Sequence, residues 1–98
     1  MSEEVAAPSR IDRTVDARRL LCPMPILKAE AAMRDMRDGE ILEVRATDPG
    51  LNNDLPAWCR SQGHRFLGIH RQGRDLTGWV AKGLKDPFGL DARATSPI

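Results

Sequence analysis

The sequence predicts an α/β (α+β) two-layer sandwich in the order βαβαββ, with a mixed four-stranded sheet and two helices on one of its faces. Two observations lead to this prediction. Segments in which apolar and polar residues alternate, as in half-buried strands, take turns with segments in which apolar residues recur every three or four positions, as in amphipathic helices. The length of 98 residues also leaves room for one domain and little else.

Four segments are expected to form strands. Residues 11–17 contain a brief alternating patch that predicts an edge strand. Residues 40–47, with the sequence EILEVRAT, alternate cleanly and predict a half-buried strand. Residues 64–71 and 76–82 predict the two strands of a hairpin, because the turn-forming residues 72–75 lie between them.

Two segments are expected to form helices. The first covers residues 25–37 and should begin near Cys22, since prolines are accepted in the first turn of a helix and hardly anywhere later. The second should begin at Asp54 as its N-cap, with Pro56 in its first turn, and run to Gln62. The apolar residues expected to face the core from the first helix are Ile26, Ala29, Met33 and Met36.

These elements divide the chain into a flexible lead at residues 1–11, a folded domain at 12–82 and a flexible tail at 83–98. A formal net charge of +1 provides no global field to hold nucleic acid or an anionic membrane, so direct binding to either is not expected. No apolar run reaches the roughly 20 residues that span a bilayer, and the acidic start does not resemble a secretion signal. We therefore expect a cytoplasmic, monomeric protein.

The tetrapeptide Cys22-Pro23-Met24-Pro25 places one thiol at the entrance of the first predicted helix. The positive end of a helix dipole favours a thiolate over a thiol, and two nearby cations, Arg18 and Arg19, are possible electrostatic helpers in the same direction. Pro23 and Pro25 have no N–H, so that only alternate amides such as that of Met24 remain to face an anion. The prolines are therefore expected to make the backbone that holds Cys22 rigid. Cys22 itself is expected to be reactive, with a lowered pKa.

Several separated motifs, taken together, closely resemble the TusA/SirA-type sulfur-carrier (sulfurtransferase) family. The likeness extends from about residue 15 to residue 82. The motifs are Val15-Asp16-Ala17-Arg18, Leu21-Cys22-Pro23-Met24-Pro25-Ile26, Gly39-Glu40, Thr47-Asp48-Pro49-Gly50, Asp54-Leu55-Pro56-Ala57-Trp58-Cys59 and Gly63-His64.

The resemblance implies the βαβαββ sandwich and a cytosolic protein that carries sulfane sulfur as a persulfide on Cys22, with Pro23 and Pro25 in structural support. The partners it implies are a persulfide donor protein (a cysteine desulfurase or a rhodanese-type protein) and an acceptor thiol protein, and it implies no cofactor. This chain departs from the family pattern at Arg19, where relatives usually have glycine, and at Gly78, where they tend to have an aromatic residue.

Other readings of the same residues stay open. Cys59 is expected to be a buried core residue beside Trp58, and its functional alternative is a resolving thiol that forms a disulfide with Cys22. The two histidines lack the close cysteine pair of a structural zinc site, so no metal is expected. The alternatives to a sulfur carrier are a non-catalytic regulatory or RNA-contacting module and a Cys22/Cys59 thiol redox switch.

Overall fold

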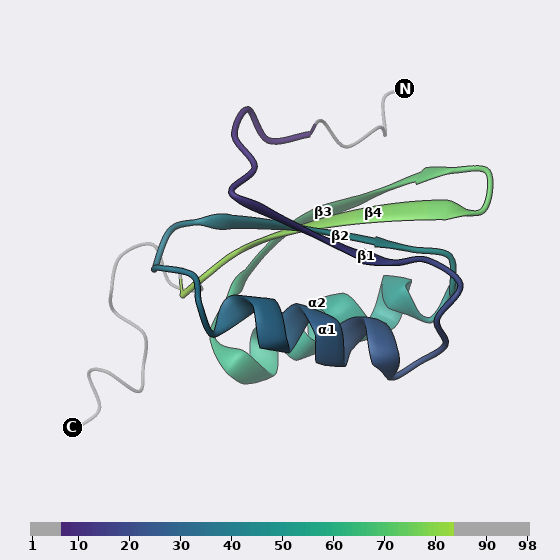
Figure 1. Ribbon diagram of the computed structural model, residues 1–98, viewed down its shortest axis with the longest axis horizontal. Helices are drawn as coiled ribbons and strands as arrows, with labels where there is room; N and C mark the ends of the chain where they lie inside the picture. The colour runs from purple at the N-terminus through teal and green to yellow at the C-terminus, as the bar shows by residue number, and fades with distance from the viewer. Residues whose placement is uncertain (1–6, 84–98) are drawn as a thin grey trace.

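A computed structural model describes residues 7–83 of the chain. Four strands and two helices follow one another in the order βαβαββ, and Figure 1 shows both helices on the same side of the sheet. The elements are β1 (Arg13–Ala17), α1 (Met24–Met33), β2 (Ile41–Ala46), α2 (Leu51–Gln62), β3 (Arg65–Gln72) and β4 (Asp75–Ala81). The predicted two-layer α+β sandwich is therefore confirmed. The tail expected at residues 83–98 lies, except for its first residue, outside the described part, as do residues 1–6.

The strands lie in the order β1-β2-β4-β3. Strand β1 runs parallel to β2 at one edge, whereas β2 with β4 and β4 with β3 are antiparallel, so the sheet is mixed as predicted. Because β1 and β2 are parallel, with Ala17 opposite Ala46, both strands end at the same edge of the sheet. The segments that lead into α1 and α2 therefore start side by side, and this arrangement positions the candidate site.

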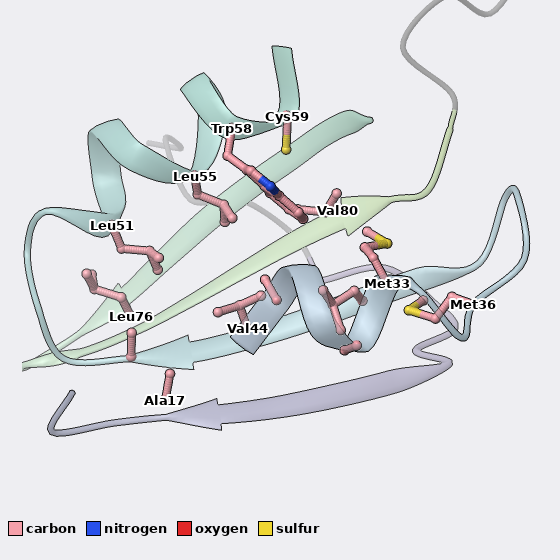
Figure 2. Packing of buried hydrophobic residues seen from close by; sticks show 14 residues of the cluster. Ala17, Met33, Met36, Val44, Leu51, Leu55, Trp58, Cys59, Leu76 and Val80 are labelled. Carbon is pink, nitrogen blue, oxygen red and sulfur yellow. The ribbon is translucent and has the colours of Figure 1, made fainter. Parts of the chain in front are cut away.

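The core lies between the sheet and the two helices (Figure 2). The alternation predicted for residues 40–47 is confirmed, because Leu42, Val44 and Ala46 of β2 are fully buried. The residues expected to line the inner face of α1 are also confirmed: Ala29, Met33 and Met36 are buried and Ile26 packs against them. Neither helix within residues 7–83 is long and apolar enough to cross a membrane.

Helix α1 is shorter than the predicted 25–37, since it ends at Met33. The chain then continues in tighter turns, in which the amide of Met36 donates to the carbonyl of Met33 at 3.1 Å. The Lys82 ammonium donates to both carbonyl groups, at 2.6 Å for Met33 and 2.5 Å for Met36. A lysine that is distant in sequence thus satisfies the carboxyl end of the helix, which local periodicity does not reveal.

Helix α2 begins one turn earlier than predicted, at Leu51 with Gly50 as the N-cap. Asp54 is therefore not the cap and lies in the first turn, and Pro56 lies inside the helix. The amide of Gly50 donates to the Asp48 carboxylate at 3.1 Å. The predicted end of this helix is confirmed, because Gly63 adopts the left-handed conformation with φ of 80°. The extra turn leaves the Asp54 carboxylate without a capping role.

The predicted hairpin is confirmed, with Gly73 and Arg74 as the two residues between the paired Gln72 and Asp75. Gly73 has a φ of 65°, as tight hairpin turns require. Farther along β4, Gly78 lies beneath α2. A β-carbon placed at Gly78 would collide with the Leu55 side chain, so the missing side chain allows α2 to approach the sheet closely. A side chain at this position would require the Leu55 side chain to move.

We predict that Gly78→Ala lowers the free energy of unfolding by about 1–3 kcal/mol, because it overpacks the contact with Leu55. Leu55→Ala alone should cost about 2–5 kcal/mol through the cavity it leaves. If the collision is the cause, the double variant Leu55→Ala/Gly78→Ala will lose less free energy of unfolding than the two single variants lose in sum. Urea unfolding measures all three losses. Strict additivity of the two losses would contradict this contact.

Candidate functional site

Cys22 lies in the segment between β1 and α1, two residues before the helix begins, and it is exposed. Its backbone amide donates a hydrogen bond to Oδ2 of Asp48 at 2.8 Å. Its Sγ donates to Oδ2 of Asp54 at 2.9 Å. Both carboxylates come from the chain that follows β2, so the parallel pairing of β1 and β2 brings the thiol and its two acidic neighbours together.

The two prolines flank the start of α1. Pro23 is the N-cap residue, and the Cys22–Pro23 peptide bond is cis. Pro25 is buried in the first turn, and its role in structural support stays a prediction. The amide of Met24, however, donates to the carbonyl of Leu21 at 2.8 Å. The prediction that this amide is free to face an anion is therefore wrong.

Asp48 organises the loop around the thiol. One of its oxygens accepts from the amide of Cys22 and the other accepts from that of Gly50. The bonds from these two amides, the one from Gly50 first, hold the pKa of the Asp48 carboxyl below its usual value. Asp48 is therefore a charged clamp between the segment before α1 and the start of α2.

The electrostatics at Cys22 oppose the sequence-based prediction of a lowered pKa. The hydrogen bond to Asp54 favours the protonated thiol and raises the pKa of Cys22 above its ordinary value. Partial desolvation and the negative charges of Asp54 and Asp48 act in the same direction. The prediction considered the helix dipole and the neighbouring arginines, and it was wrong because Asp54, which is distant in sequence, accepts a hydrogen bond from the sulfur and the charges of Asp54 and Asp48 act on it.

The two arginines that were considered as electrostatic helpers have other partners. The Arg18 guanidinium makes a bidentate ion pair with Asp16, at 2.8 and 2.9 Å, and holds the pKa of that carboxyl well below its usual range. Arg19 has a φ of 72°, and its amide donates to Oγ1 of Thr47 at 2.8 Å. The charged groups that act on the pKa of Cys22 are carboxylates. A helper role for either arginine stays a prediction.

The conformation of Arg19 explains why the family pattern has glycine at this position. Glycine adopts a positive φ readily, whereas a residue with a side chain is strained there. Arg19 thus stands at a position where the backbone itself favours glycine. Arg19 lines a surface hollow together with Arg18 and Lys28.

Cys59 differs from Cys22 in its surroundings. It is 1% exposed, points into the core from α2 beside Trp58 (Figure 2), and burial raises the pKa of its thiol to about 12. The expectation of a buried core residue is confirmed. A resolving role would require this sulfur to leave the core, and it stays a prediction.

No group of three His, Cys, Asp or Glu side chains suited to hold a metal ion occurs between residues 7 and 83. His64 lies at the start of the hairpin with its ring 5.1 Å from that of Trp58, and its Nδ1 accepts from the amide of Gly83. These contacts give the histidine a packing role.

Sequence reasoning missed two features of the site. The first is Asp54, which was interpreted as a helix cap although it contacts the sulfur of Cys22. The available signal was the spacing of Asp48 and Asp54 after the predicted strand. The second is a set of exposed apolar side chains around the thiol. Leu21, immediately before Cys22, is 72% exposed, and Met24 and Leu27 in the first part of α1 are 43% and 49% exposed. Exposed apolar groups of this kind are typical of contact surfaces.

The family profile described as "Sulfurtransferase TusA" matches residues 13–82. The chain belongs to the TusA sulfurtransferase family. It is 47% identical over 72 residues to the "Putative sulfur carrier protein YrkI" of Bacillus subtilis (strain 168). The matched residues make up 74% of this chain and 96% of that protein. This membership supports a sulfur-carrier role and, with it, interaction with sulfur donor and acceptor proteins.

Two longer relatives carry similar names. The "Putative sulfur carrier protein YrkF" of the same B. subtilis strain is 46% identical over 69 residues, a match that covers 70% of this chain and 37% of that protein. A "Putative sulfur carrier protein" of Aquifex aeolicus (strain VF5) is 32% identical over 71 residues, covering 72% of this chain and 36% of the relative. The TusA-type domain thus corresponds to little more than a third of these two proteins.

We predict that Arg19→Gly raises the free energy of unfolding by about 1 kcal/mol, because glycine relieves the positive φ. Chemical denaturation measures this gain, and Arg18→Gly is the matched control, which should destabilise because it loses the ion pair with Asp16. The alkylation midpoint of Cys22 should not change in Arg19→Gly. A loss of stability in that variant would contradict the strain, and a rise in the midpoint would establish Arg19 as an electrostatic helper.

Proposed function

We propose that the protein carries sulfane sulfur as a persulfide on Cys22 and passes it to an acceptor thiol. The observation that carries the proposal is the exposure of the Cys22 sulfur at the start of α1 in a TusA-family chain, while the sulfur of Cys59 is enclosed in the core. A sulfur carrier needs one thiol that other proteins can reach. Cys22 meets that need, and the raised pKa and burial of Cys59 oppose it for the second thiol.

The transfer is redox-neutral. The Cys22 thiolate attacks the terminal sulfur of a donor persulfide R–S–SH, a new S–S bond forms, and the old S–S bond breaks with its electron pair leaving on R–S⁻. The proton lost by Cys22 is balanced by the proton that the departing thiolate takes up, so that Cys22–SH and R–S–SH become Cys22–S–SH and R–SH. An acceptor thiolate then attacks the outer sulfur and Cys22 leaves as a thiolate.

The raised pKa of Cys22 alters the rates of the two transfer steps but not the bonds that form and break. A higher pKa reduces the fraction of thiolate at neutral pH, but it makes the thiolate that forms a stronger nucleophile. It also makes Cys22 a poorer leaving group in the second step. The free protein is therefore expected to be a slow nucleophile that becomes efficient when its surroundings change.

Proteins are the partners that this surface fits best. Exposed Leu21, Met24 and Leu27 offer apolar contact area beside the thiol, which a small persulfide does not need. A cysteine desulfurase or a rhodanese-type protein is the proposed donor, and a second thiol protein is the proposed acceptor. We place this chemistry in the cytoplasm, because a reducing compartment keeps such thiols free to react.

Intact mass spectrometry tests the assignment. After incubation with a persulfide-loaded donor, the wild-type protein and Cys59→Ala should each gain the mass of one sulfur atom, and Cys22→Ala should gain none. A reductant should remove the added mass, which distinguishes a persulfide from other modifications. Sulfur uptake by Cys22→Ala together with no uptake by Cys59→Ala would overturn the assignment.

A further inference from the structure

The Asp54 carboxylate is placed to control the chemical state of Cys22. Its Oδ2 lies 2.9 Å from the sulfur, and within residues 7–83 this is the hydrogen bond made by its side chain. Asp48, in contrast, uses its two oxygens to bind backbone amides. Asp54 therefore faces the reacting sulfur with its carboxylate, which as an acidic group in the first turn of α2 also interacts favourably with the helix dipole. Asp48, by contrast, has a structural role in the loop.

The charged groups around the sulfur come from each element that meets there. Asp54 is contributed by α2 and Asp48 by the loop after β2. On the segment that carries Cys22, Arg18 is paired with Asp16, and Arg19 lines the hollow that Lys28 of α1 also lines. The charged side chains in contact with Cys22 are thus negative, and the cations line a hollow together with Asp16 and Asp75.

We propose that Asp54 keeps Cys22 in its protonated form in the free carrier, and that a sulfur partner activates the thiol by bringing a cationic group to Asp54. This inference rests on the proposed sulfur-carrier function and adds the chemistry by which a partner is recognised. A lysine or arginine next to the partner's own sulfur would pair with the Asp54 carboxylate and draw it away from the S–H group. The released proton passes to the solvent or to the thiolate that leaves the donor, so the overall transfer stays balanced.

A protonated thiol in the free carrier would affect both its side reactions and its choice of partner. A free carrier that holds a protonated thiol resists oxidation and unproductive disulfide exchange, because the thiolate is the reactive species in both. A partner thiol that lacks a neighbouring cation meets two carboxylates and a protonated sulfur, and is rejected. The acidic pair therefore selects partners whose reactive sulfur lies in a basic surface.

The first test measures the rate of Cys22 alkylation by neutral iodoacetamide as a function of pH, in a Cys59→Ala background so that one thiol remains. Replacing Asp54 by Asn should make the reaction about two- to threefold faster near neutral pH. This factor combines the interaction of two unit charges in water with the lower nucleophilicity of the more acidic thiol. At pH values above the pKa of the wild-type thiol, the wild type should react faster than Asp54→Asn, since its thiolate is the stronger nucleophile.

Matched variants separate this effect from a general loss of charge or of structure. Asp35→Asn removes one negative charge from the far end of α1, where Asp35 pairs weakly with Arg13, and should leave the pH profile unchanged. Asp54→Glu keeps the charge and should stay closer to the wild type than Asp54→Asn. Identical profiles for Asp54→Asn and the wild type, with folding verified by circular dichroism, would overturn the proposal.

The second test compares two thiosulfonate reagents of equal size, one cationic and one anionic, on the same variants. The wild type should favour the cationic reagent, and Asp54→Asn should lose at least about half of that preference. An unchanged ratio would contradict the selection of cationic partners. Sulfur uptake by intact mass keeps the two proposals distinguishable: a shifted alkylation profile without uptake refutes sulfur carriage alone, and uptake with an unshifted profile refutes the role of Asp54 alone.

Discussion

The site depends on the contact between the segment that precedes α1 and the segment that follows β2. Strands β1 and β2 are parallel neighbours, so their carboxyl ends meet at one edge of the sheet and the two helices start there together. Asp48 joins the two segments through the amides of Cys22 and Gly50. With that clamp in place, the extra first turn of α2 carries Asp54 to the sulfur. The position of the thiol and its protonation both follow from this pairing.

This environment differs from the simplest idea of a reactive cysteine at a helix entrance. A helix dipole and nearby arginines would favour the thiolate. Here the amide of Met24 is already bonded within the turn, Arg18 is paired with Asp16, and the groups nearest the sulfur are acidic. Under the proposed function, the thiol of the free carrier is held in its less reactive, protonated form. Its reactivity would then depend on the charged groups that a partner brings to Asp54.

Much of the fold could be predicted because it is encoded locally. The alternation at residues 40–47, the Gly73 turn and the glycine that ends α2 each depend on neighbouring residues, and the structure agrees with all three. The two predicted helix boundaries that were wrong have different causes. The end of α1 depends on a distant contact, because Lys82 binds the carbonyl groups there, and a local pattern does not carry that information. The start of α2 depends on a local contact, because Asp48 accepts from the amide of Gly50 two residues later, and the prediction gave the capping role to Asp54 instead.

The same distinction applies to the site. The sequence indicated Cys22 through its adjacent prolines, and it indicated a buried Cys59 through its position beside Trp58. It did not reveal that Asp54 lies against the sulfur, because residues 32 positions apart come together only through the parallel strands. The positive φ of Arg19 explains why the family pattern has glycine there, and it too requires knowledge of the backbone.

The most direct test is an NMR titration that follows the Cβ of Cys22 and the carboxyl carbon of Asp54 in the same sample. The Cys22 resonance should titrate with a midpoint above that of an ordinary cysteine. The Asp54 resonance should shift at the same pH, because its carboxylate accepts the hydrogen bond from the thiol. A midpoint at or below the ordinary value, with no response from Asp54 at that pH, would contradict the proposed role of Asp54.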